Sequence, residues 1–182
     1  MKKTSFFVIC ILIISVFVCT PSFSVTIDDI DGTWNTWSKA KLKISSVGSF
    51  TDENFSETTL TLTGNFTLVE HSSGGPWSYT GTFSIIDGKK LSIAFDANGV
   101  NELIDTWKNW AQEIAADKGV TVSNINFSIE SLTISQPSIN KKTLIPKKTT
   151  VKAKGLASAL VNGEPFLKKF SYSSKVSFIG RQ

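Results

Sequence analysis

The sequence predicts an all-β protein, an antiparallel up-and-down barrel of about eight strands with one amphipathic α-helix inserted between strands five and six. Three observations predict this fold class. Thr, Ser, Phe, Ile and Val are abundant, and β-branched and aromatic residues are typical of strands. Several segments alternate apolar and polar residues with a period of two, which turns one face inward. One segment instead repeats its apolar residues at intervals of three and four, as an amphipathic helix does.

The first strand is expected at residues 33–44, where inward and outward residues alternate. Lys39, Lys41 and Lys43 fall in step on the outer face, which marks that face as solvated. The residues expected on the inner face are Trp34, Thr36, Ser38, Ala40, Leu42 and Ile44. Residues 45–54 are polar and are expected to form a loop.

The second strand is expected near residues 57–63, and a third follows it after a short turn. Residues 77–86 and 89–96 form the clearest hairpin. Asp87 and Gly88 lie between these two strands. A type I′ turn prefers this pair because both of its central residues need a positive φ.

The period then changes to that of a helix. The apolar stripe consists of Leu103, Ile104, Trp107, Ala111 and Ile114. Asn98 or Asn101 is expected to cap the start of the helix, and Gly119 to end it. The pattern leaves open whether this helix flanks, caps or fills the barrel.

Three strands complete the chain, at residues 120–134, 149–161 and 166–179, and the last two are joined around Asn162 and Gly163. Eight antiparallel strands form either a sandwich or a closed barrel. The meander order favours the barrel. Closure removes exposed strand edges, so we expect a monomer.

The first 24 residues are expected to be a secretory signal peptide. A basic start is followed by a short apolar run and by small residues before Val25. After its removal, residues 25–182 are expected to form one barrel domain, located in the periplasm or outside the cell. Anchoring as a lipoprotein through Cys19 is less favoured, because the residue before this cysteine is not small.

Residue counts exclude several kinds of chemistry. Both cysteines, Cys10 and Cys19, precede residue 25, so the exported chain has no thiol or disulfide. His71 is the only histidine, and neither a nucleophile motif nor a metal-binding motif accompanies it. We therefore expect no enzyme activity, no cofactor and no metal site. Arg181 is the only arginine, which argues against a nucleic-acid partner.

Short sequence features near the start of the first strand and the end of the last strand resemble those of the lipocalins. Gly32-Thr33-Trp34 at the start of the first strand is similar to the G-x-W of that family. Arg181 near the end of the last strand matches the arginine that lipocalins pack on this tryptophan. The hairpin around Asp87 also resembles those of small exported bacterial lipocalin-like proteins of the calycin type. The resemblance implies a ligand-binding barrel, with Trp34 and Arg181 as a structural pair.

Aromatic residues are numerous enough to line a ligand pocket, although a small barrel also needs large side chains to fill its core. The residues expected to form the pocket wall are Trp34, Trp77, Tyr79, Phe83, Phe95 and Trp107. Trp110 is expected at the pocket mouth. A row of small residues on one face of the strand at 149–161 leaves room beside it. Either a ligand or the helix, through Trp107 or Trp110, occupies that room.

Charge is distributed unevenly along the chain. Residues 25–134 carry a net charge of −7, whereas residues 135–182 carry +9. If the last strand pairs with the first, seven lysines meet on one outer wall of the barrel. These lysines are Lys39, Lys41, Lys43, Lys152, Lys154, Lys169 and Lys175. Such a wall either attracts an anionic surface or is an ordinary solvated strand face.

The expected function is that of an exported, non-enzymatic protein that binds or sequesters a small apolar or amphiphilic ligand in the cell envelope. The alternative is a ligandless interaction module with a solid barrel. Such a module would dock through the lysine-rich wall on an anionic lipid surface, another envelope surface or a protein partner.

Overall fold

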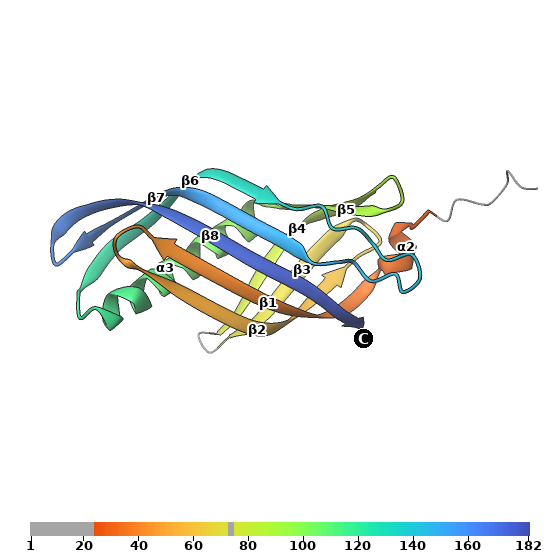
Figure 1. The fold of residues 1–182 in the computed structure, drawn as a ribbon, viewed down its shortest axis with the longest axis horizontal. Coiled ribbons are helices and arrows are strands. Elements are labelled where there is room, and N and C mark those ends of the chain that lie inside the picture. Colours follow the sequence, from red (N-terminus) through yellow and green to blue (C-terminus); the bar gives the residue numbers. More distant parts are fainter. Residues whose placement is uncertain (1–23, 73–74) are drawn as a thin grey trace, which may run out of the picture.

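A computed structural model describes residues 24–72 and 75–182 of the chain. The predicted signal peptide, with Cys19 and the lipoprotein alternative, lies outside the described residues except for Ser24. The described residues form an eight-stranded antiparallel sheet curled into a nearly closed barrel, with one long helix between the fifth and sixth strands (Figure 1). The predicted fold class is therefore confirmed.

The bounds of the elements are as follows. The first half of the chain forms α2 (Ile27–Ile30), β1 (Gly32–Ile44), β2 (Gly48–Leu60), β3 (Asn65–Ser72), β4 (Gly75–Ile86) and β5 (Lys90–Phe95). The second half forms α3 (Ala97–Asp117), β6 (Val122–Ile134), β7 (Thr149–Val161) and β8 (Glu164–Arg181).

The sheet consists of two meanders that meet at β1 and β8. Its strand order is β5-β4-β3-β2-β1-β8-β7-β6, and all neighbours are antiparallel. The first and last strands pair from Ile44, opposite Phe170, to Trp34, opposite Arg181. This long-range pairing brings the two ends of the described chain together in the middle of the sheet.

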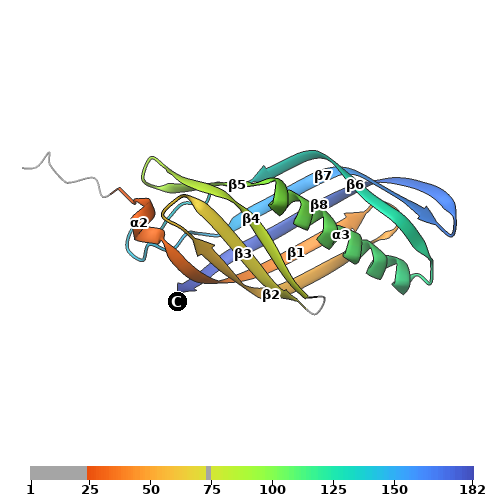
Figure 2. The same cartoon turned by 180° about the vertical axis from the view of Figure 1, so that it is seen from behind.

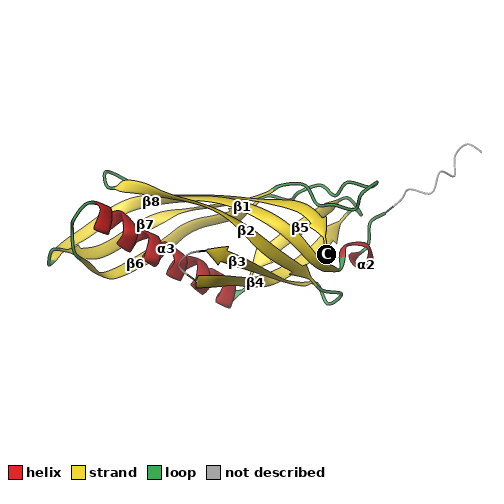
Figure 3. Ribbon diagram, turned by 90° about the horizontal axis from the view of Figure 1, so that it is seen from below, coloured by secondary structure: helices red, strands yellow, loops and turns green. Residues whose placement is uncertain are grey.

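The barrel closes differently at its two ends, because β5 and β6 are not neighbours in the sheet. At the end near α2, the segment after β6 reaches β5. There, Leu91 N–H donates to the Pro137 carbonyl at 2.9 Å, and Ile139 N–H donates to the Lys89 carbonyl at 2.8 Å. Toward the other end, α3 lies in the opening and contacts β2, β4, β5 and β6 (Figures 2 and 3). The helix thus fills the gap in the wall.

Both predicted hairpin turns are confirmed. Asp87 and Gly88 have φ values of 52° and 57°, and Asn162 and Gly163 have values of 50° and 88°. Positive φ at both central residues is what a type I′ turn requires. These turns fix the register of β4 with β5 and of β7 with β8.

The predicted loop at residues 45–54 is wrong for most of its length. Only a short turn separates β1 from β2, which begins at Gly48 and pairs with β1 from end to end. The inner face of this part of β2 carries Asp52 and Asn54, whose polarity is typical of loops. Pairing with β1 satisfies the backbone and overrides the local composition.

Asp96, rather than Asn98 or Asn101, caps the start of α3. Its Oδ1 accepts hydrogen bonds from Gly99 N–H and from the Thr80 hydroxyl, each at 2.8 Å. The helix therefore begins directly after β5, and the hydrogen bond between Asp96 and Thr80 connects its first turn to β4. At the other end Gly119, with a φ of 65°, follows the last turn as expected.

The interior contains two apolar clusters separated by polar side chains. The cluster under α3 includes Leu103, Trp107, Phe127, Phe170 and Tyr172, and is called the α3 cluster below. The cluster beside α2 is called the α2 cluster and consists of Val25, Ile30, Trp34, Leu60, Phe66, Phe83, Leu91 and Ile139. Between them along β1 and β2 lie four buried hydroxyl residues, Thr36, Ser38, Ser56 and Thr58.

Candidate functional site

The main candidate binding site is a cavity of about 390 Å³ in the half of the barrel covered by α3. Its wall comes from the last turns of α3, the turn between β1 and β2, the start of β6, the end of β7 and the start of β8. Side chains of Ala111 and Ala115 on α3 face Ala157 and Ala159 on β7 across it. The cavity is therefore formed where small residues on a helix oppose small residues on a strand.

The row of small residues on β7 is filled in one part and open in another. At Gly155 the Phe170 ring and the backbone of β6 approach so closely that a Cβ atom would lie 1.9 Å from the Ser128 carbonyl oxygen. Trp107 stacks on that Phe170 ring, with 5.0 Å between centroids. Farther along the strand, Ala157 and Ala159 border the cavity. The helix thus occupies the first part of the row only.

Three of the lining residues are polar. Ser46 lies in the turn between β1 and β2, Ser158 on β7, and Lys118 just after α3. Lys118 is the only charged residue in the lining and is exposed to solvent. The cavity can therefore hold an apolar body with a polar or anionic end at Lys118.

Trp110 does not lie at the mouth of this cavity, contrary to expectation. It is buried, with its ring 5.1 Å from that of Phe50 and 6.3 Å from that of Tyr172. The reason is geometric. Trp107 and Trp110 are three residues apart on one helix, so both turn toward the barrel interior.

The structure distributes the six predicted wall residues over both clusters. Trp34 and Phe83 belong to the α2 cluster, whereas Tyr79 and Trp107 belong to the α3 cluster. Trp77 packs against the α3 cluster, and Phe95 packs against both. The rings of Tyr79 and Phe95 lie near each other, with centroids 6.4 Å apart.

None of these six residues lines the 390 Å³ cavity. Phe95 borders a second, smaller apolar space of about 50 Å³, together with Thr58 and Thr149. That space has room for only one or two water molecules. The assignment of the six aromatics to a ligand wall stays a prediction.

Sequence reasoning did not identify most residues of the larger cavity, such as Val122 and Ile125 on β6. Two signals were present. The small-residue row of β7 continues past Gly155 to Ala157 and Ala159. On α3, alanines at positions 111 and 115 repeat at an interval of four and so share a face.

Trp34 and Arg181 lie together. The Arg181 Cζ is 5.9 Å from the centroid of the Trp34 ring, and the two residues are partners across β1 and β8. Trp34 Nε1 donates to the Ile30 carbonyl at 2.9 Å, and Phe178 packs against the ring edge-on. These contacts fix the first strand, the last strand and α2 at one end of the barrel.

The buried carboxyl group of Glu70 lies beside Ser38, one of the hydroxyl residues that separate the two apolar clusters. The Tyr79 hydroxyl donates to Glu70 Oε2 at 3.3 Å and also bonds the Thr106 hydroxyl at 2.9 Å. Burial raises the pKa of Glu70. Hydrogen bonds from Ser38 and Tyr79 lower this pKa and so partly oppose the effect of burial. Burial also raises the pKa of Tyr79, so this hydroxyl remains a hydrogen-bond donor. The arrangement links β3, β4 and α3.

The seven predicted wall lysines are all exposed on the outer face of three adjacent strands, β1, β8 and β7. We call this surface the lysine wall. Lys39 lies directly opposite Lys175, whereas Ser173 separates Lys41 from Lys152. Among the described residues, Lys39 is the only wall lysine with a carboxylate partner, Glu53 on β2. The wall is thus an almost uncompensated positive surface.

Comparison of the chain with protein-family models, with curated proteins and with solved structures finds no significant match. Within residues 24–72 and 75–182, no group of three or more His, Cys, Asp or Glu side chains is placed to hold a metal ion. None of the helices in that part of the chain has the length and apolar character needed to cross a membrane.

Proposed function

We propose that this protein binds or sequesters a small apolar or amphiphilic ligand without altering it chemically. The observation that carries the proposal is the 390 Å³ cavity beside α3. Its volume falls in the range of about 300–1,000 Å³ that is common for small-molecule sites. Its lining is mostly apolar, with aliphatic side chains and two aromatic ones, Phe127 and Phe166, so burial of apolar ligand surface would supply most of the binding free energy.

The form of the lining defines the ligand class. Alanine and valine leave a smooth wall without hydrogen-bonding groups, which suits a hydrocarbon chain or a flat apolar ring system. Lys118 and Ser46 supply the polar side chains of the lining, whereas the Ser158 side chain lies on the opposite face of β7 from Ala157 and Ala159. A ligand with one apolar body and one polar or anionic end fits this distribution best.

The barrel and the resemblance to lipocalins support the same proposal. Trp34 and Arg181 are in contact at the end of the barrel near α2, as the resemblance implies. We propose, on the same basis, that the chain is an exported lipocalin-like protein acting in the periplasm or outside the cell. The cavity beside α3, rather than the aromatic residues predicted from the sequence, would be its binding site.

Filling the cavity tests the proposal. The probe is anilinonaphthalene sulfonate, an aromatic anion whose fluorescence rises in apolar sites. We expect Ala159→Phe to reduce probe affinity at least about tenfold, because the new ring takes the space of the ligand. Ala94→Phe is the matched control, since Ala94 is exposed on β5 and lines none of the cavities described. Equal probe binding by wild type and Ala159→Phe would contradict the proposal.

A second candidate function is favoured by the lysine wall. Among the strands that carry it, β1 contributes three basic residues, β7 two and β8 four, whereas Glu164 is their single acidic residue. We propose that this wall binds an anionic surface. Retention on immobilised polyglutamate, reversed by added salt, is the expected result. Failure to be retained at low salt would count against it.

A further inference from the structure

Several large apolar side chains lie on the outside of the barrel, where most strand positions are polar, and three of them lie close together. Phe55 on β2 is 66% exposed, Ile179 on β8 is 54% exposed, and Trp37 on β1 is half-buried beneath Phe55. The Trp37 and Phe55 rings are cross-strand partners in an edge-to-face arrangement, with centroids 4.7 Å apart. We call these three residues the outer apolar patch.

The patch is a continuous surface rather than three isolated residues. Phe55 and Ile179 border the same surface cleft, of about 360 Å³, together with Asn35 and His71. Ile179 follows Lys175 and Ser177 at intervals of two along β8, so it lies on the same outer face. The pairing of β8 with β1 shifts by one residue between Asn35 and Thr36, which leaves Ile179 as the extra residue of a bulge.

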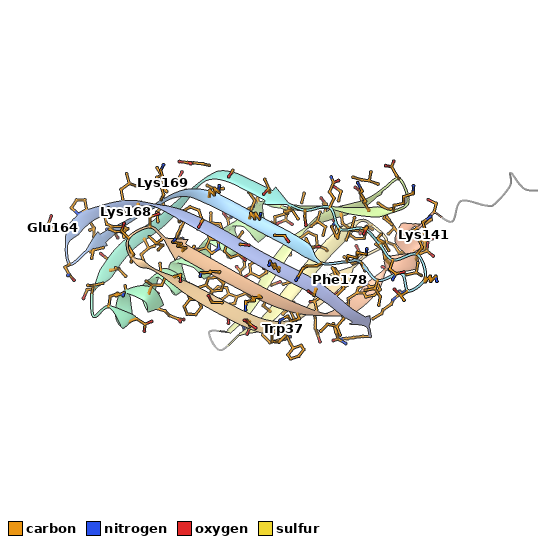
Figure 4. All side chains as sticks on the ribbon, viewed as in Figure 1. Trp37, Lys141, Glu164, Lys168, Lys169 and Phe178 are labelled. Atoms are coloured by element: carbon orange, nitrogen blue, oxygen red, sulfur yellow. The ribbon has the colours of Figure 1, made fainter. Side chains whose placement is uncertain are left out.

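The outer apolar patch adjoins the lysine wall on the same face. Lys39 follows Trp37 by two residues on β1, so their Cα atoms are about 7 Å apart. Lys39 lies opposite Lys175 on β8, and serines occupy outward positions between the remaining lysines. In Figure 4, Trp37 lies toward the β1 and β2 side of this face, and Lys168 and Lys169 lie toward the turn between β7 and β8.

Acidic side chains are confined to the borders of this surface. Glu164 is at the turn between β7 and β8, Glu53 on β2 is paired with Lys39, and exposed Glu130 lies on β6 at the bulge next to the partner of Lys154. Glu57, also on β2, accepts a hydrogen bond from the Gln182 amide at 3.1 Å. The centre of the face therefore presents lysines, serines and the apolar patch, with no carboxylate on β1 or β7.

We propose that this face docks on an anionic lipid bilayer, with the lysine wall at the level of the lipid phosphates and the outer apolar patch inserted among the headgroups. The proposal rests on the second candidate function and names its partner. Lysines near an anionic bilayer are attracted to its surface potential, and aromatic side chains favour the membrane interface. Each effect alone is weak, whereas two such signals on one face give stable attachment.

The residue types favour lipid over an acidic protein as the partner. Interfaces between proteins are enriched in arginine and depleted in lysine, because the guanidinium group forms paired hydrogen bonds with carboxylates. All seven charges of the wall are lysines. An acidic protein partner would also have no need for an isoleucine and a phenylalanine that are more than half exposed.

The experiment measures co-sedimentation with vesicles of phosphatidylcholine, with and without added phosphatidylglycerol. Wild type is expected to bind only the anionic vesicles, and less at high salt. Replacing Lys41, Lys43, Lys152 and Lys154 with serine, which already occupies outward positions on this face, should weaken binding about fivefold per lysine. The double variant Phe55→Ser with Ile179→Ser should also weaken vesicle binding but leave retention on polyglutamate unchanged.

Two controls separate insertion from loss of folding. Leu62→Ser removes an equally exposed apolar residue at the turn after β2, outside the patch, and should bind vesicles as wild type does. Lipids brominated in their acyl chains quench tryptophan emission on insertion. That quenching should fall sharply in Trp37→Phe, since Trp34, Trp107 and Trp110 are buried and Trp77 lies on β4, which is not one of the strands of this face.

The outcomes distinguish this inference from the function on which it rests. If the double variant binds anionic vesicles as wild type does, the lysine wall acts alone and the inference is wrong. If wild type binds polyglutamate but not anionic vesicles, the partner is an acidic macromolecule and the inference is wrong, while the second candidate function stands. If wild type binds neither, both are wrong.

Discussion

At the scale of single residues, Trp107 connects the helix to the barrel. Its side chain is fully buried, and its ring lies 5.0 Å from those of Phe170 and Tyr172 and 5.7 Å from that of Phe127. One tryptophan of α3 thus contacts both β6 and β8. Its Nε1–H has no hydrogen-bond partner among the described residues, so packing alone holds it there.

Replacement of Trp107 with alanine should lower the free energy of unfolding by about 3–5 kcal/mol, because a large buried ring is lost and a cavity remains. Urea denaturation measures this loss. Phe55→Ala is the matched control, since that ring is mostly exposed and its removal should change stability by no more than about 0.5 kcal/mol. Similar losses for both variants would mean that α3 is not packed in the barrel as described.

Glu70 should make stability depend on pH. Its pKa is raised by burial in the folded state, so the folded protein holds this proton more tightly than the unfolded chain does. The contribution of Glu70 is therefore fully present below its unfolded pKa and is lost as pH rises through its folded pKa. Asp29 and Asp96, whose pKa values are lowered by hydrogen bonds, act in the opposite direction.

Comparison of wild type with Glu70→Gln isolates this effect. We expect the stability of wild type relative to the variant to fall as pH rises through the range above the unfolded pKa of glutamate, about 4.3. Urea midpoints measured at several pH values test it. A difference between the two proteins that does not change with pH would show that Glu70 titrates normally.

At the scale of elements, the start of α3 is held against β4. Gly99 lies in the first turn, and a Cβ atom there would be only 2.1 Å from the Thr80 carbonyl oxygen. The helix and the strand are therefore as close as their backbones allow. This contact, with the Asp96 cap, fixes the angle at which the helix leaves β5.

Alanine at position 99 should consequently destabilise the protein. In an ordinary helix, Gly→Ala is stabilising by about 1 kcal/mol. Here the added methyl group would force α3 away from Thr80, so the urea midpoint should fall. Asn98→Ala, one residue earlier in the same turn, is the control and should leave the midpoint nearly unchanged. A rise in stability for Gly99→Ala would contradict the described contact.

Several elements could be predicted from sequence because their signals are local. Asp87-Gly88 and Asn162-Gly163 specify their turns through backbone preference alone. The alternation of β1 identifies its inner face residue by residue. The first half of β2 could not be predicted, because Asp52 and Asn54 are polar on the inner face and only pairing with β1 makes the segment a strand.

The candidate site was predictable only in part. The small residues of β7 indicated space beside them, and that space exists at Ala157 and Ala159. Which part of it the helix fills depends on where Trp107 meets Phe170, a contact between elements about sixty residues apart. The sequence alone does not define that register, so the aromatic residues received more weight than the alanines and valines that line the cavity.

At the scale of the whole molecule, the two proposed functions use two different surfaces of one barrel. The cavity lies beside α3, whereas the lysine wall with its apolar patch lies on the outer faces of β1, β2, β7 and β8. Figure 2 shows α3 on the side of the barrel that faces away from the viewer in Figure 1. A protein arranged in this way would bind a ligand with one part of the barrel and a membrane with another. Ligand binding would depend on α3, because this helix leaves the space beside Ala157 and Ala159 of β7 open.

The most direct test of the central claim is native mass spectrometry of the protein purified without detergent from the cells that produce it. We predict an additional mass, reproducible between preparations, which dissociates on collisional activation and is absent from Ala159→Phe. A bare protein mass for wild type, together with no change in tryptophan emission on addition of fatty acids or lipids, would contradict ligand binding and leave the cavity as a packing defect.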